Sequence, residues 1–342
     1  MERRLDPLGY KRILRERRAS YEPLFASGVW RYRELLPPID PASIVSLAEG
    51  NMPLYDAPSG ASYAGVDRLA YLHLGMNPTG SFKDLGMTVA VSAAKAAGMR
   101  GVVAASTGNT ASSMAAYAAR AGLEAHALVP RGRVTQAKLA QMLEYGARIV
   151  EVEGSFDDAF AQLDRIADGA LQIVNSTNPF RLEGQKCAAF SILEQRGWHV
   201  PDWVVLPGGN LGNISAIGRG FREALELRLI DRLPRLALVR ADAGTQTRAT
   251  AIAVGNPQSR EKASRELRES DGIELVASDE AIFAAKAQIG REGIGCEPAS
   301  AASLAGLRIL REQGRVAPDA DVVAVLTGHV LKDVGAVQHA AV

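Results

Sequence analysis

A lysine inside a turn-forming segment is the residue of this sequence best suited to covalent chemistry. It is Lys83, in the segment Gly75-Met-Asn-Pro-Thr-Gly-Ser-Phe-Lys-Asp84. Pro78 and Gly80 interrupt the preceding extended stretch, and Ser81 can cap a helix that starts there. Lys83 then falls in the first helical turn, where the helix dipole favours the neutral amine that attacks carbonyl carbons. The same pattern also fits a surface lysine in a helix cap, so other segments must decide.

Two further segments place small polar residues or glycines directly after expected strands. Ser106-Thr-Gly-Asn-Thr110 precedes an alanine-rich helix, whose exposed N–H groups and neighbouring hydroxyls suit a carboxylate. Asn109 alone is equally suited to cap that helix. Gly209-Asn-Leu-Gly-Asn213 suits a phosphate, because glycines let backbone N–H groups approach it closely. It matches neither the dinucleotide fingerprint GxGxxG nor an ATP-binding loop, and a glycine-rich turn without a ligand is its alternative.

Two polar segments complete the candidate site. Leu326-Thr-Gly-His-Val-Leu-Lys-Asp333 closes the last expected strand, and a buried hydroxyl at Thr327 can hydrogen-bond an aromatic ring nitrogen without protonating it. Asn175-Ser-Thr-Asn-Pro-Phe-Arg-Leu-Glu-Gly-Gln-Lys186 brings Arg181 to the next helix, where its planar donor fork suits a phosphate ester. The plainer alternatives are a capped turn for the first segment and a solvated pair of Arg181 with Glu183 for the second.

Short apolar strands that alternate with helical patterns position these segments. Strands are expected over residues 101–105, 124–129, 148–152, 171–174, 203–206, 236–240, 273–277 and 321–326, and helices over 84–97, 111–121, 134–145 and 156–167. This alternation predicts an α/β fold with mainly parallel sheets covered by helices on both faces. Because no sharp linker is present, we expect two interleaved lobes. Ligands in such folds bind beyond the C-terminal ends of the strands, where the candidate segments lie.

Charge and cysteine content exclude several classes of partner. The chain has 39 basic and 38 acidic residues, a net charge of +1, which predicts no general attraction to nucleic acid or to an anionic membrane. Cys187 and Cys296 lie far apart and lack the spacing of a disulfide framework or a zinc site. The charged N-terminus is unlike a secretory signal, and no apolar run of about 20 residues appears. We therefore expect a cytoplasmic protein without metal, nucleic acid or membrane partner.

Taken together and in order, the motifs resemble the threonine synthase family of pyridoxal-phosphate (PLP) enzymes. The matching segments are Glu49-Gly-Asn-Met-Pro-Leu54, Asn77–Asp84, Ser106–Thr110, Asn175–Arg181, Gly209–Asn213, Glu297-Pro-Ala-Ser-Ala301 and Thr327–Asp333. The resemblance extends from about residue 25 to about residue 335. It implies a fold-type-II PLP enzyme and a homodimer. It also implies a smaller mobile lobe, residues 75–180, which carries the lysine and the substrate-carboxylate loop, and a larger lobe, residues 1–74 and 181–342, which carries the cofactor-phosphate loop.

The resemblance also assigns roles to individual residues. Lys83 matches the catalytic Schiff-base lysine, and Asn109 matches the residue that faces the phenolic oxygen of pyridoxal 5'-phosphate. The cofactor-phosphate loop corresponds to Gly209, Asn210, Leu211, Gly212 and Asn213, and Thr327 matches the partner of the ring nitrogen. The substrate carboxylate site corresponds to Ser106, Thr107 and Thr110, and the substrate phosphate site to Asn175, Ser176 and Arg181.

The implied activity is that of a carbon–oxygen lyase in threonine biosynthesis. Phosphate leaves Cγ of O-phospho-L-homoserine and water adds at Cβ to give L-threonine, with Lys83 moving the protons. The sequence departs from the family at Met52, at Val330 and at Pro207-Gly208. Because of these departures, the substrate and the nucleophile stay undecided. The alternative activities are those of a β- or γ-replacement synthase acting on another phosphorylated amino acid and of a serine/threonine dehydratase. A third alternative is a catalytically silent protein that keeps the fold.

Overall fold

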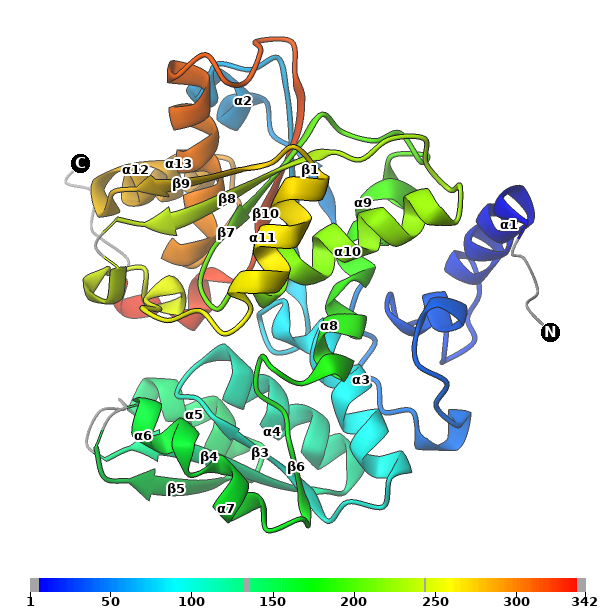
Figure 1. The fold of residues 1–342 in the computed structure, drawn as a ribbon, viewed down its shortest axis with the longest axis vertical. Helices are drawn as coiled ribbons and strands as arrows, with labels where there is room; N and C mark the ends of the chain where they lie inside the picture. The colour runs from blue at the N-terminus through cyan, green and yellow to red at the C-terminus, as the bar shows by residue number, and fades with distance from the viewer. Residues whose placement is uncertain (1–5, 132–135, 155, 243, 337–342) are drawn as a thin grey trace. The chain divides into compact units, whose positions relative to one another are not determined.

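The computed structural model describes residues 6–131, 136–154, 156–242 and 244–336, and the chain folds into two compact units (Figure 1). The first unit comprises Met1–Glu16, Asn51–Met76 and Ala188–Val342. The second unit comprises Arg17–Gly50 and Asn77–Cys187. The chain therefore interleaves, as the sequence predicts. The boundaries differ from the expected 75–180 lobe, because the second unit also includes Arg17–Gly50 and extends to Cys187.

The first unit is built on a six-stranded sheet in the order β1-β2-β10-β7-β8-β9. Its strands are β1 (Leu54–Asp56), β2 (Arg68–His73), β7 (Trp203–Pro207), β8 (Arg235–Ala241), β9 (Ile273–Ala277) and β10 (Asp321–Leu326). Every neighbouring pair is parallel except β1 with β2, which is antiparallel. The predicted, mainly parallel sheet is thus confirmed, and β1 and β2 are additions that the sequence analysis did not name.

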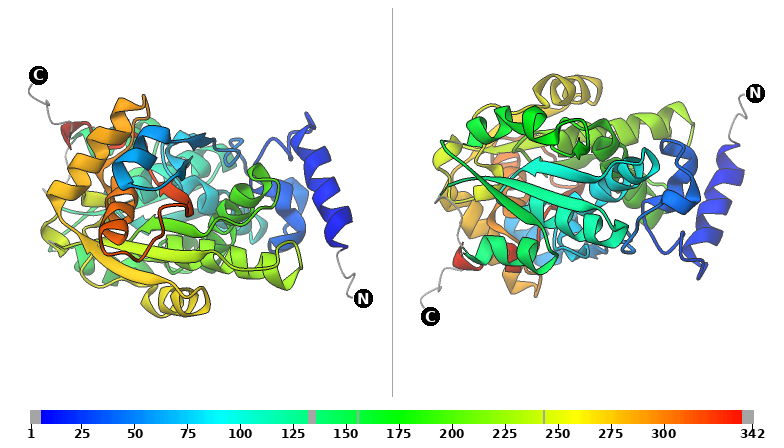
Figure 2. Two further views of the ribbon diagram at one scale, coloured as in Figure 1. Left: turned by 90° about the horizontal axis from the view of Figure 1, so that it is seen from above. Right: turned by 90° about the horizontal axis from the view of Figure 1, so that it is seen from below.

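Helices cover both faces of this sheet, and the alternation along β8 shows why. Ala237 and Val239 pack into the core formed with α12 (Asp279–Arg291) and α13 (Pro298–Glu312). Leu236 points to the other face, where it lies against Gly218 of α10. The two views of Figure 2 place α13 and α11 on opposite sides of the sheet. The other helices of this unit are α2 (Pro58–Ala64), α9 (Cys187–Gln195), α10 (Gly212–Glu226) and α11 (Arg260–Glu269), and α1 spans Pro7–Arg18.

The second unit holds a four-stranded, fully parallel sheet in the order β5-β4-β3-β6. Its strands are β3 (Gly101–Ala105), β4 (Glu124–Pro130), β5 (Arg148–Val152) and β6 (Leu171–Ile173). Val102 and Ala104 face α3 (Lys83–Ala96), α4 (Asn109–Ala121) and α5 (Gln136–Glu144), whereas Val103 and Ala105 face α6 (Phe156–Ala161) and α7 (Leu163–Ala167). Helix α8 (Pro179–Gln185) packs on α3. The first residues of the helix expected over 134–145 lie outside the described residues.

The segment Arg17–Gly50 belongs to the second unit because its side chains are buried there. The indole N–H of Trp30 donates to Thr88 Oγ1 at 2.8 Å, and Tyr117 donates to Glu49 Oε2 at 2.7 Å. Its regular structure is limited to 3-10 turns, so it carries no hydrophobic periodicity that would reveal this packing. The 3-10 helices of the chain are η1 (Trp30–Leu35), η2 (Pro41–Ser43), η3 (Leu74–Met76), η4 (Gly244–Gln246), η5 (Thr250–Ile252), η6 (Val330–Lys332) and η7 (Val334–Ala336).

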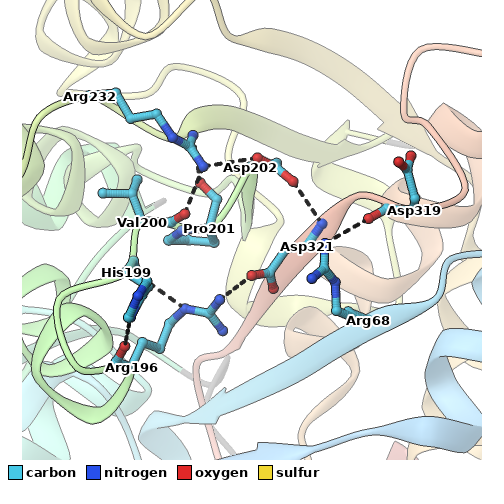
Figure 3. Close-up of polar contacts among 9 residues, drawn as sticks. All are labelled: Arg68, Arg196, His199, Val200, Pro201, Asp202, Arg232, Asp319 and Asp321. Carbon is cyan, nitrogen blue, oxygen red and sulfur yellow. Dashed lines mark hydrogen bonds and ion pairs between the residues drawn. The ribbon is translucent and has the colours of Figure 1, made fainter.

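A charged network joins the N-terminal ends of β2, β7 and β10 in the first unit (Figure 3). Asp202 Oδ2 accepts from the backbone N–H of Asp321 at 2.9 Å. Arg232 pairs with Asp202 at 2.9 Å and Arg196 pairs with the Asp321 carboxylate. The Arg68 guanidinium donates to a backbone carbonyl in the turn before β10. This end of the sheet serves the register of the strands, whereas Gly209–Asn213 and Thr327 of the same unit follow the opposite ends of β7 and β10.

Cys187 and Cys296 are both free and buried. None of the helices within the described ranges combines the length and the hydropathy needed to cross a membrane. The described residues likewise contain no group of three or more His, Cys, Asp or Glu side chains arranged to hold a metal ion.

Candidate active site

Lys83 is the first residue of α3 and follows a tight turn of the second unit. The backbone N–H of Gly80 donates to the Asn77 carbonyl, and Gly80 has a φ of 85°, a conformation that glycine adopts without strain. The Ser81 hydroxyl accepts from the Lys83 N–H at 3.4 Å. Lys83 Nζ lies 3.7 Å from the centroid of the Phe82 ring. The turn thus delivers the amine at the start of the helix, where the dipole favours its neutral form.

The neighbouring Asp84 is a buried carboxylate that the sequence analysis did not single out. Its Oδ2 accepts from the Thr79 N–H at 2.7 Å, and its Oδ1 accepts from the hydroxyls of Thr79 and Ser113, each at 2.6 Å. Burial raises the pKa of Asp84 to about 6, although these hydrogen bonds oppose the shift. Its position beside the lysine at a helix start was the only sequence signal that pointed to it.

The turn between β3 and α4 carries four of the predicted site residues in half-buried positions: Ser106, Thr107, Asn109 and Thr110. Gly108, with a φ of −132°, is the N-cap of α4, and Asn109 is the first helical residue. Asn109 therefore does not occupy the cap position that was its alternative role. The Ser106 hydroxyl accepts from the Gly108 N–H at 3.3 Å. Backbone donors at this helix start and two threonine hydroxyls suit an anion.

Asn175 ties the loop after β6 to the end of β3. Its side-chain amide donates to the Ala105 carbonyl at 2.9 Å, and its Oδ1 accepts from the Ala105 N–H at 3.1 Å. Ser176 follows in a half-buried position. The structure therefore brings the expected substrate-phosphate segment beside the strand end that leads into Ser106.

Arg181 is a buried cation, 1% exposed, without an acidic partner in the described part of the chain. Its Nη1 donates to the Val174 carbonyl at 3.0 Å, whereas its Nε has no hydrogen-bond partner among the residues that the structure describes. Burial lowers the pKa of Arg181 to about 10. Glu183 pairs with Lys186 at 2.6 Å, so the solvated Arg181–Glu183 pair that was the alternative is not what the structure contains.

The glycine-rich segment Gly209–Asn213 connects β7 to α10 in the first unit and includes the first two residues of that helix. Leu211 has a φ of 63°, and α10 begins at Gly212, so the first N–H groups of the helix have no acceptor within the helix itself. Both amide atoms of Asn213 are buried, and neither has a partner among the described residues. A Cβ at Gly208 would lie 2.6 Å from Leu238 Cδ1, which explains the glycine at this departure from the family. These donors fit a phosphate group.

Thr327 follows β10 and is held by two residues of the segment Glu297–Ala301. Its Oγ1 lies 3.0 Å from Ser300 Oγ and 3.4 Å from Glu297 Oε1. Ser300 Oγ also accepts from the N–H groups of Thr327 and Gly328, each at 2.9 Å. A Cβ at Gly328 would lie 2.4 Å from the Glu297 carboxylate carbon. Ser300 and Glu297 are positioning residues that the sequence analysis noted only as part of a motif.

The unusual residue Val330 packs on a glycine. Its Cγ1 would lie 2.6 Å from a Cβ at Gly295, so the absence of a side chain at Gly295 makes room for Val330.

A cavity of about 620 Å³ in the first unit is lined by Gly295 and by two histidines, His73 and His329. The two imidazole rings stack with centroids 6.2 Å apart. Burial lowers the pKa of His73 to about 4, so that ring is neutral near pH 7.

A lysine at a helix start, a glycine-rich loop before a helix and a hydroxyl after a strand are present on two α/β units, as the resemblance to fold-type-II PLP enzymes implies. In agreement, residues 45–328 match the family described as "Pyridoxal-phosphate dependent enzyme". The chain belongs to this family, and its cofactor is pyridoxal 5'-phosphate.

The curated relatives narrow the class further. The chain is 45% identical over 327 residues to "Threonine synthase" of Methanocaldococcus jannaschii, covering 90% of this chain and 81% of that protein. The corresponding protein of Synechocystis sp. is 46% identical over 316 residues, covering 88% and 82%. The family resemblance seen in the motifs is thus confirmed.

Solved structures share the fold at low identity. Maize serine racemase superposes with a TM-score of 0.72 at 18% identity, covering 96% of this chain and 94% of that one. A threonine deaminase from Solanum lycopersicum superposes with a TM-score of 0.71 at 20% identity, covering 84% and 81%. These similarities concern the fold alone.

Proposed function

We propose that this protein converts O-phospho-L-homoserine and water into L-threonine and phosphate. The proposal is supported by threonine synthases that are 41–46% identical over nearly nine-tenths of the chain. The single structural observation that favours a phosphorylated substrate is the buried, unneutralised guanidinium of Arg181. A dehydratase that acts on serine or threonine has no second phosphate to pair with such a group.

We assign each part of the cofactor to a residue that binds it. Lys83 forms the covalent link, and Asn109 faces the phenolic oxygen. Gly209–Asn213 binds the phosphate, and Thr327 bonds to the ring nitrogen. The unsatisfied amide of Asn213 and the N–H groups at the start of α10, which have no acceptor within the helix, support the phosphate assignment. When bound, the cofactor supplies the electron sink that stabilises negative charge at the substrate carbons.

The chain's own residues bind the substrate and move its protons. Lys83, as a neutral amine, takes and returns protons at Cα and Cβ. The hydroxyl of Thr327 is held in place by Ser300. Because this hydroxyl is neutral and keeps its proton, it can hydrogen-bond the ring nitrogen and leave it unprotonated. Ser106, Thr107 and Thr110 hold the substrate carboxylate at the start of α4.

Arg181 holds the substrate's phosphate in this proposal, with Ser176 beside it. A phosphate would neutralise the buried guanidinium and satisfy its free Nε, which offsets the free energy of burying an unpaired charge. Both amide atoms of Asn175 bond to the backbone of Ala105. Asn175 therefore supports the site by fixing the loop after β6. We further propose that the protein acts in the cytoplasm as a homodimer, as the family resemblance implies.

The test is a comparison of substrates together with variants of Arg181. We expect phosphate and threonine from O-phosphohomoserine, and much slower turnover of O-phosphoserine, serine and threonine. Arg181→Ala should raise KM for O-phosphohomoserine about tenfold or more, because a charge-assisted contact is lost, and leave PLP loading unchanged. Arg181→Lys should have a KM between those of the wild type and Arg181→Ala, because lysine keeps the positive charge but lacks the planar, two-donor geometry of the guanidinium.

Arg120→Ala, an exposed arginine of the same unit, is the matched control and should behave like the wild type. An unchanged KM in Arg181→Ala would remove the assigned role. Ammonia and keto acid from serine or threonine, without turnover of O-phosphohomoserine, would identify a dehydratase instead.

A further inference from the structure

The carboxylate of Asp84 is fully buried and has no part in the reaction proposed above. It accepts three hydrogen bonds from neutral donors, at 2.6–2.7 Å. No lysine or arginine in the described ranges pairs with it. A buried carboxylate without a cation is destabilising unless its hydrogen bonds offset the loss of water. A neutral, well-packed residue would fill this place at lower cost, so the carboxylate calls for a functional explanation.

The three donors come from two elements that carry candidate site residues. Thr79 lies in the turn that delivers Lys83, and it donates both its N–H and its hydroxyl. Ser113 lies on α4, one turn beyond Asn109 and Thr110. Helices α3 and α4 pack against each other within the second unit. One carboxylate therefore connects the turn before the lysine to the helix that begins with the substrate-carboxylate site.

A second buried carboxylate extends this polar chain along α4. Glu49 accepts from Tyr117, which lies one turn after Ser113, and from the hydroxyls of Ser27 and Ser46. Its charge contributes to the raised pKa of Asp84. Two like charges held close together in the interior are further evidence that the arrangement is kept for geometry rather than for stability.

Resting on the proposed function, we propose that Asp84 is a positioning residue that holds Lys83 at a fixed distance from the carboxylate-binding turn of α4. It touches no reacting atom and acts through Thr79 and Ser113. Proton transfer at the substrate requires the amine within hydrogen-bond reach of carbon atoms whose place is set by the carboxylate contact. An error of about 1 Å in such a placement lowers rates by up to about a hundredfold.

The test compares Asp84→Asn with Asp84→Ala in the PLP-loaded enzyme. An asparagine can accept from the Thr79 N–H and donate to the two hydroxyls, which rotate to accept, so it keeps the link without the charge. We expect Asp84→Ala to lower kcat about tenfold or more, with KM changed less than about threefold, and Asp84→Asn to restore most of the loss. Ser113→Ala, which removes one of the three hydrogen bonds, should have a kcat between those of the wild type and Asp84→Ala.

A second readout does not depend on turnover: the rate at which added PLP becomes covalently attached to Lys83, followed by absorbance and by borohydride reduction with mass analysis. We expect slower attachment in Asp84→Ala than in Asp84→Asn. This readout separates the two proposals, because it keeps its meaning if O-phosphohomoserine proves not to be the substrate.

Thr88→Val is the matched control for a merely structural effect. Thr88 is equally buried on α3, and it donates to the Val45 carbonyl and accepts from Trp30. We expect this variant to lower Tm without changing kcat or the attachment rate. If Thr88→Val lowered kcat as much as Asp84→Ala, or if Asp84→Asn were as impaired as Asp84→Ala, the positioning role would be overturned. Should Asp84→Ala fail to fold, Ser113→Ala against Thr88→Val decides by the same criterion.

Discussion

Single side chains at the candidate site have unsatisfied polar atoms where a protein interior normally has none. Asn213 has two such atoms and Arg181 has one, and both residues are buried. Because a buried donor or acceptor without a partner is destabilising, these positions support the proposal that a ligand completes the hydrogen bonding there. The structure thus separates residues with unsatisfied polar atoms from residues such as Asp84, whose carboxylate accepts three hydrogen bonds.

Asn213→Leu tests this separation at the residue scale. Replacing an orphaned amide by an apolar side chain of similar size should raise the stability of the cofactor-free protein by about 1–3 kcal/mol and weaken PLP binding about tenfold or more. Melting curves with and without PLP, and a titration followed by absorbance, measure both effects. Unchanged PLP affinity would show that the amide does not face the cofactor.

At the scale of elements, two glycines let α3 and α8 cross in close contact. A Cβ at Gly184 would lie 1.8 Å from the Leu85 carbonyl oxygen, and one at Gly86 would lie 2.6 Å from the Arg181 carbonyl oxygen. The helix that begins the site at Lys83 and the helix that carries Arg181 are therefore held backbone to backbone. This crossing sets where the guanidinium lies relative to α3.

Gly184→Ala should consequently destabilise the protein by about 1–3 kcal/mol or more, because the methyl group meets backbone that cannot move aside. Gly290→Ala, one residue before the end of α12, is the control, because no side chain and no backbone beyond its own helical turns lies within 4 Å of the added Cβ. It should be neutral or stabilising by about 0.5–1 kcal/mol. Chemical denaturation of both variants measures the difference, and equal stabilities would refute the close crossing.

At the scale of the whole molecule, the chain enters the second unit, leaves it for β1 and β2, and then returns. Arg17–Gly50 therefore completes a unit whose sheet lies later in the sequence. Trp30 is 1% exposed, and its indole N–H donates to Thr88 at 2.8 Å. The integrity of the second unit depends on a segment without hydrophobic periodicity.

Trp30→Ala should lower stability by about 3–5 kcal/mol through lost burial. Hydrogen exchange resolves where the loss falls: amides of β3 and β4 should lose more protection than those of β7 and β8. Tyr21→Ala, at a fully exposed position of the same segment, should leave both sheets protected. Equal loss in both sheets would contradict the assignment of this segment to the second unit.

The order of strands and helices along the chain was predictable because short runs of β-branched and other apolar residues mark the strands, both in the buried β3 and β10 and in the partly exposed edge strands β5 and β9. The expected strands over 101–105, 148–152, 273–277 and 321–326 agree with β3, β5, β9 and β10 residue for residue. The three-residue edge strand β1 and its partner β2 were not named. The antiparallel edge that they form depends on pairing between strands, which a single run of residues does not record.

The sequence by itself determined the family and the cofactor, through its ordered motifs. It also determined the helix-start position of Lys83, because turns and helix starts depend on residues close together in the chain. Only the tertiary structure decided which polar groups are buried, which of them are satisfied and what they join. Among the described residues, Arg181 belongs to no ion pair, Asn175 bonds to Ala105, and Asp84 links Thr79 to Ser113. Such contacts connect residues up to 70 positions apart, and desolvation depends on the atoms that surround a group in space rather than on its neighbours in sequence.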